Sequence, residues 1–162
     1  MAMFVHLAPA DAEASIRRSG VRPRKTAEGV AGVYVMPVLP SYVTTYQWLR
    51  ELKRWTTART LIAVQVRIPD DEPVRVGRYN RAHLDVTAAE SVAIMRDLND
   101  ARGHQVFVPR ALRPNEIHRI RQVDQGLGWR YQPDAHDSRP CVCPVCIPHG
   151  APYSRRLKNR LG

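Results

Sequence analysis

Short apolar runs recur along most of the chain and predict β-strands. They are rich in valine, are bounded by proline, glycine or polar turns, and span 3–7, 29–36, 60–68, 74–76 and 105–109. In the second half of 60–68, apolar and polar residues alternate, which predicts one buried and one solvent-facing side. Helical patterns separate the early runs, whereas turn residues separate the later ones.

The segments between the early strands have the spacing of amphipathic helices. The pattern at 10–19 predicts a helix with Asp11 as its N-cap, and Gly20 follows where a left-handed residue commonly ends a helix. Residues 44–55 predict a second helix, which Thr44 or Thr45 caps. Its apolar side chains recur at helical spacing and form one stripe of Trp48, Leu49, Leu52 and Trp55.

Two later segments also have helical features. Thr87 and Glu90 have the spacing of a capping box, which predicts a helix over 87–99. Its expected inward-facing residues are Val92, Ile94, Met95 and Leu98. Pro114 suits the first position of a helix, so a helical turn is expected over 114–120.

This order of elements predicts an α+β fold with a small, split, antiparallel-rich sheet and helices on its faces. A chain of 162 residues is long enough to bury one core. We expect an α+β domain over 1–125, with a zinc knuckle and a basic tail over 126–162 packed on it.

The net charge of +10 at pH 7 predicts a polyanionic partner, with nucleic acid first. Basic residues gather in three stretches, and the alternative is a basic but non-specific surface. The candidate phosphate contacts are Arg17, Arg18, Arg22, Arg24, Lys25, Arg50, Lys53, Arg54, Arg155, Arg156, Lys158 and Arg160. No leader-like segment or long apolar run is present, so we expect a cytoplasmic protein that does not insert in a membrane.

The three cysteines of the chain lie within six positions near its end. Three thiolates and one imidazole form a common closed zinc set, so Cys141, Cys143 and Cys146 predict a structural zinc site with His149 or His136 as the fourth ligand. A disulfide between Cys143 and Cys146, or free thiols, is the alternative.

The early segments resemble an ADP-ribosyltransferase fold. The resemblance rests on a first strand with His6, the helix "SIRRSGV", the strand "GVYVMP", an aromatic-led helix and the late "QVFVPRALRPNEIHRI", and it covers about 3–120. It implies that His6 holds the ribose of NAD and that Tyr34 and Tyr46 pack on the nicotinamide. Each of these residues also has an ordinary interpretation as part of the core.

The resemblance also implies a glutamate that opens the late strand, where this chain has Gln105. A neutral amide does not supply the negative charge that a carboxylate places beside a developing cation. Either Glu90 or Glu116 is the acid, or the chain binds without transferring. RNA 2′-phosphotransferases are related in fold and have basic residues in place of the glutamate.

The tail is similar to the zinc segment of tRNA-guanine transglycosylases, in its Cys-x-Cys-x-x-Cys spacing and the following "YSRRL". This similarity implies a knuckle beside a basic segment. Two functions are therefore expected from the sequence. One is an ADP-ribosyltransferase-like enzyme that uses NAD on a nucleic-acid or protein target, and the other is a non-catalytic, zinc-containing nucleic-acid-binding protein.

Overall fold

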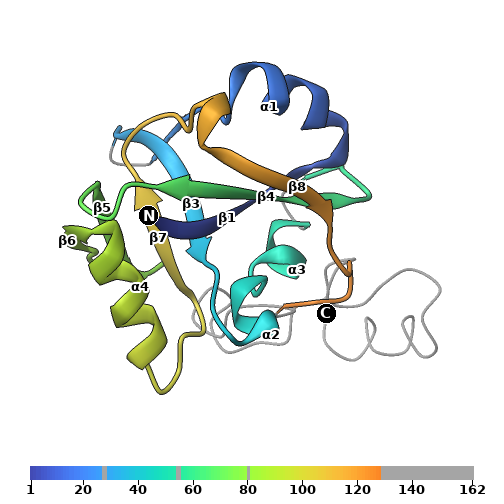
Figure 1. Ribbon diagram of the computed structural model, residues 1–162. Coiled ribbons are helices and arrows are strands. Elements are labelled where there is room, and N and C mark those ends of the chain that lie inside the picture. The colour runs from blue at the N-terminus through green and yellow to red at the C-terminus, as the bar shows by residue number, and fades with distance from the viewer. Residues whose placement is uncertain (27–28, 54–55, 80, 129–162) are drawn as a thin grey trace, which may run out of the picture.

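An antiparallel sheet organises the computed structural model, which describes residues 1–26, 29–53, 56–79 and 81–128 (Figure 1). Within it, β1 (Ala2–Pro9) pairs with β4 (Leu61–Ile68) along the full length of both strands. The strand order is β6-β5-β7-β3-β1-β4-β8, and β2 pairs with β3. The remaining strands are β2 (Arg24–Lys25), β3 (Ala31–Pro37), β5 (Pro73–Arg78), β6 (Leu84–Thr87), β7 (His104–Val108) and β8 (Ile117–Gln122).

The helices lie on both faces of this sheet. After a 3-10 turn, η1 (Ala10–Ala12), come α1 (Glu13–Ser19), α2 (Tyr42–Thr45), α3 (Leu49–Leu52), α4 (Ala88–Asp97) and the 3-10 turn η2 (Pro114–Glu116). Ile16 of α1 and Met95 of α4 are buried in the main core, with Val64 and Val66 of β4. Tyr46, at the end of α2, and Leu49 of α3 pack into a second cluster with three strand residues, namely Val5, Leu61 and Ala63.

The two halves of the sheet are joined by very little pairing. β1 and β3 pair only at Phe4 with Pro37 and at Val5 with Met36. Beyond these positions, β3 pairs with β2 and β7, whereas β1 continues along β4. The sheet therefore opens between the second half of β1 and the first half of β3.

The expected α+β class with an antiparallel sheet is confirmed, and so are two expected helix ends. Thr87 and Glu90 form the reciprocal capping box of α4. Gly20 follows α1 with φ 75°, and a Cβ there would collide with the backbone oxygen of Leu112. The strand β4 has the expected wet side, with Arg67 exposed between the buried Val66 and Ile68.

The single helix expected at 44–55 is wrong. α2 and α3 are short and separate, and the side chain of Ser41, not Thr44 or Thr45, caps α2. The link between them is held by tertiary hydrogen bonds, because the buried Gln47 amide accepts from Gly103 N and donates to Ala101 O. These contacts replace the continuous helix that the apolar spacing indicated.

Two smaller expectations also need correction. Asp11 is not the N-cap of α1, since Ala12 holds that position without a side-chain hydrogen bond. Only 114–116 of the turn expected at 114–120 is helical, and the following residues form β8. Pairing with β4 satisfies the backbone of β8 and brings Ile117 and Ile120 against the core. The strand β6 was not expected at all.

Candidate active site

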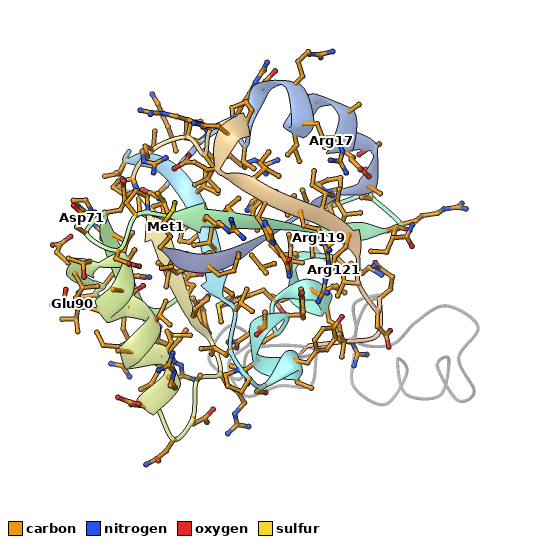
Figure 2. The ribbon with its side chains drawn as sticks, viewed as in Figure 1. Met1, Arg17, Asp71, Glu90, Arg119 and Arg121 are labelled. Carbon is orange, nitrogen blue, oxygen red and sulfur yellow. The ribbon has the colours of Figure 1, made fainter. Side chains whose placement is uncertain are left out.

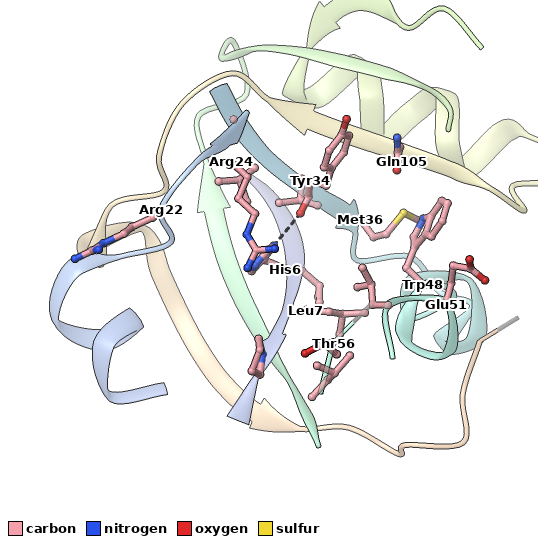
Figure 3. A pocket seen from close by; sticks show the side chains of 17 residues that line it. His6, Leu7, Arg22, Arg24, Tyr34, Met36, Trp48, Glu51, Thr56 and Gln105 are labelled. Carbon is pink, nitrogen blue, oxygen red and sulfur yellow. Dashed lines mark hydrogen bonds between the residues drawn. The ribbon is translucent and has the colours of Figure 1, made fainter. Parts of the chain in front are cut away.

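A cavity of about 380 Å³ lies where β1 and β3 separate (Figure 3). Its volume lies within the usual range of small-molecule sites, roughly 300–1,000 Å³. The walls come from β1, the segment around β2, β3, α3 and the start of β7. The lining residues with polar or aromatic side chains are His6, Arg22, Arg24, Tyr34, Trp48, Glu51, Thr56 and Gln105.

A glycine on β3 helps to open this cavity. Gly32 is buried, and a Cβ there would collide with the ring of Phe107 and the backbone oxygen of Val108. Only a residue without a side chain lets β3 approach β7 so closely. The first half of β3 is thereby held on β7 and kept apart from β1.

His6 bridges the two separated strands. Its Nδ1 lies 2.9 Å from the carbonyl oxygen of Tyr34. A carbonyl only accepts hydrogen bonds, so Nδ1 carries the hydrogen and, in the neutral ring, Nε2 is an acceptor. Burial lowers the pKa of His6, the hydrogen bond to Tyr34 opposes this, and the nearby Arg24 charge lowers it further. The neutral form is therefore favoured.

Tyr34 supplies an aromatic surface at the cavity. Its side chain is 44 % exposed, although it lies in an otherwise buried stretch of β3. The ring packs against Phe107 at a centroid distance of 5.0 Å and a tilt of 54°. The exposed part of this ring is suited to packing on a planar ligand.

Gln105 enters the same cavity from β7 (Figure 3). Its Nε2 lies 3.4 Å from Nε2 of His83, and its strand partner on β5 is Gly77. A Cβ at Gly77 would stand only 3.0 Å from His83, so the missing side chain makes room for the imidazole beside Gln105. The Gln105 amide is thus supported by a neighbour that sequence reasoning did not find.

Cationic side chains line one wall. Arg22 and Arg24 are exposed and have no ion pair with any residue that the structure describes. The carboxylate in the lining belongs to Glu51, which is buried on α3. The wall formed by β2 and the residues just before it is therefore suited to an anionic group such as a phosphate.

The expectation that Tyr46 joins this site is not met. Tyr46 is 1 % exposed, packs on Tyr42, and its hydroxyl accepts a hydrogen bond from Arg121 at 2.9 Å. It does not line the cavity. Trp48 does, with its indole nitrogen donating to His104 O at 2.9 Å and its ring edge-on to Tyr79. The break between α2 and α3, which the sequence did not reveal, explains why Trp48 lines the cavity and Tyr46 does not.

The two alternative acids also lie elsewhere. Glu90 is bound to the backbone and hydroxyl of Thr87, and these hydrogen bonds lower its pKa. Glu116 is paired with Arg110 at 2.7 Å, and Arg110 also binds Glu72. Burial raises the pKa of Glu116, but the hydrogen bonds from Arg110 and from the Arg113 backbone outweigh it, so its pKa is lowered. Neither lines the cavity.

The candidate phosphate contacts are dispersed rather than gathered. Arg17 is paired with Glu13 on α1, whereas Arg22 and Arg24 belong to the cavity. Arg50 and Lys53 lie at α3, and burial, followed by the charge of Arg50, lowers the pKa of Lys53. Arg18 and Lys25 are exposed. The remaining predicted contacts lie outside the described residues, namely Arg54, Arg155, Arg156, Lys158 and Arg160.

The predicted zinc ligands Cys141, Cys143, Cys146, His149 and His136 also lie outside the described residues. Within the ranges that the structure describes, no group of three or more histidine, cysteine, aspartate or glutamate residues is placed to hold a metal. Likewise, none of the helices in this part of the chain has the length and apolarity needed to cross a bilayer.

Comparison of the chain with protein-family models, curated proteins and solved structures finds no match.

Proposed function

We propose that this protein is an ADP-ribosyltransferase-like enzyme that uses NAD on a nucleic-acid or protein target. The observation that supports this most strongly is the meeting of His6, Tyr34 and Gln105, from three strands, in one cavity. NAD supplies ADP-ribose when the bond between its ribose and its nicotinamide breaks.

The chemistry of the walls matches the parts of NAD. Tyr34 and Trp48 offer aromatic surface to a planar ring, and Nε2 of neutral His6 accepts a hydrogen bond from a ribose hydroxyl. Arg22 and Arg24 offer charge-assisted hydrogen bonds to a pyrophosphate. These residues bind and orient the dinucleotide.

The neutral side chain of Gln105 determines the rate of NAD turnover that we expect. Its amide oxygen carries only a partial negative charge, so it stabilises positive charge at the reacting ribose less than a carboxylate does. We therefore expect measurable NAD binding together with slow turnover.

The test of this role is Gln105→Glu. A carboxylate at the same position should raise NAD hydrolysis by about tenfold or more, because it places a full negative charge beside the developing cation. Release of nicotinamide, followed by chromatography, measures the rate. Gln65→Glu is the matched control, since Gln65 also lies part-buried in a strand but does not line the cavity. An unchanged rate in Gln105→Glu, or an equal rise in both variants, would refute the catalytic role.

A structural zinc held by Cys141, Cys143 and Cys146 with His149 or His136 belongs to the same proposal. The reduced thiols that this site requires favour a cytoplasmic location. The second candidate function, nucleic-acid binding without catalysis, is favoured by the net charge of +10 and by the exposed arginines. Loss of NAD binding together with retained binding of nucleic acid would select it.

A further inference from the structure

Three arginines share one face of the sheet at β4 and β8. Arg119 is opposite Gln65 and Arg121 is opposite Ala63, and Arg67 is two positions from Gln65 along β4. Residues directly opposite one another, or two apart on one strand, lie on the same side of a sheet. The row formed by Arg67, Arg119 and Arg121 is called the arginine row below.

The arginine row carries charge that no carboxylate within the described ranges neutralises. Arg67 and Arg119 are exposed, and neither has an ion pair with any residue in the described ranges. Arg121 is oriented by the Tyr46 hydroxyl, with its guanidinium carbon 6.0 Å from the centre of that ring. Figure 2 places Arg119 and Arg121 together on β8, on the side of the molecule away from Asp71 and Glu90.

Exposed aromatic and apolar side chains border the arginine row. Tyr42 is 44 % exposed and packs at 4.5 Å on Tyr46, the same ring that Arg121 contacts. Val38 is also exposed, and its backbone nitrogen donates to Met3, which pairs with Arg67 across β1 and β4. A basic row and an open tyrosine ring are thus presented on one face.

We propose that this face binds a single strand of nucleic acid, with phosphates on the arginine row and a base stacked on Tyr42. Backbone charge and an aromatic platform are the two elements of single-strand binding, because an unpaired base has a free face whereas a paired base does not. A protein or membrane partner would satisfy the charge but would not require the open ring.

The position of this face gives it a role in the proposed function. Leu7 and Leu61, which line the cavity, belong to the same side of β1 and β4 as Ala63 and Arg121. A strand held on the arginine row therefore lies on the same side of the sheet as these two residues of the cavity wall. This inference names the acceptor of the proposed transfer and rests on the proposed function for that step, whereas the binding itself does not require NAD.

The experiment uses the full-length protein and a labelled 12-nucleotide single-stranded oligonucleotide, in RNA and DNA forms, with the blunt duplex of the same sequence as a competitor. Arg67→Ala with Arg119→Ala should reduce the slope of log K against log salt by about 0.7 for each lost phosphate contact. Tyr42→Ala should weaken single-strand binding by about tenfold, through the lost stacking. Arg96→Ala, which removes one charge, is the control for the effect of each lost charge, since Arg96 is exposed at the end of α4, which packs on the other face.

The expected result is loss of single-strand binding in the arginine-row and Tyr42 variants, with Arg96→Ala unchanged and the duplex a poor competitor. An equal salt slope in the Arg96→Ala and double variants would overturn the inference, as would full competition by the duplex or no effect of Tyr42→Ala. NAD titration of the double variant separates the two claims. If the double variant binds both NAD and the oligonucleotide as the wild type does, the proposed surface is refuted and the proposed enzyme is not. If the double variant loses oligonucleotide binding and the wild type does not bind NAD, the surface is supported and the proposed enzyme is refuted.

Discussion

His6 shows how one residue acts in both structure and chemistry. It donates from Nδ1 to the Tyr34 carbonyl across the opening between β1 and β3, where regular strand pairing has ended. That contact fixes the tautomer and orients the ring. Because burial lowers its pKa, His6 is kept as a neutral acceptor near neutral pH.

This lowered pKa predicts a pH dependence of stability. In the unfolded chain the imidazole titrates near 6.5, so below that pH the unfolded state binds more protons than the folded one, and stability falls with falling pH. His6→Asn retains an amide donor for the Tyr34 carbonyl and removes the titration. Urea unfolding at pH 7 and at about pH 5.5 should therefore show a smaller loss in the variant. Parallel losses in variant and wild type would show that other groups cause the dependence.

The sequence singled out some of the residues that line the cavity and not others, for physical reasons. His6 and Tyr34 were recognisable because each interrupts an apolar strand, and Gln105 because it opens one. The roles of Arg22, Arg24 and His83 depend on strand separation and on missing side chains at Gly32 and Gly77, which are tertiary facts. Periodicity assigned Trp48 to the core, and Trp48 does pack against the main core, but it also lines the cavity.

At the scale of elements, local signals succeeded where local contacts decide the structure. The Thr87–Glu90 capping box and the Gly20 helix end are set within a few residues of chain. The helix expected at 44–55 was wrong because Gln47 bonds to the α4–β7 connection and Trp48 bonds to His104, the first residue of β7, both far away in sequence. Apolar spacing cannot reveal such partners.

The turn at Gly20 directs the chain from α1 towards Arg22 and Arg24, so its geometry matters for the cavity. Gly20→Ala should lose about 1 kcal/mol because of its positive φ, and about 2 kcal/mol more because its Cβ meets the backbone of Leu112. Gly29→Ala is the matched control, since Gly29 has a similar φ of 82° but nothing within 4 Å of its Cβ position. Denaturant unfolding measures both. Equal losses would show that the contact with Leu112 contributes nothing.

At the scale of the whole molecule, the two faces of the sheet carry different features. The main core with α1 and α4 covers one face. The other face presents the cavity, the α2–α3 cover and the arginine row. Net charge predicted a polyanionic partner, but it did not locate the surface, because Arg67, Arg119 and Arg121 are dispersed in sequence and meet only through strand register.

The cysteine cluster gives a prediction for the intact chain. Purified protein should contain one zinc per chain, and Cys143→Ser should lower both the zinc content and the unfolding midpoint, because binding of a structural metal contributes directly to folding. Elemental analysis with thermal unfolding measures both. A zinc content far below one per chain in protein purified without chelator would contradict the site.

The central claim is that the cavity between β1 and β3 binds NAD, and calorimetric titration with matched tyrosine variants tests it most directly. Tyr34 and Tyr42 are both 44 % exposed, but only Tyr34 lines the cavity. We predict saturable NAD binding to the wild type, about tenfold weaker binding to Tyr34→Ala because an aromatic contact is lost, and wild-type affinity in Tyr42→Ala. Absence of binding to the wild type, or equal affinity in all three proteins, would contradict the account.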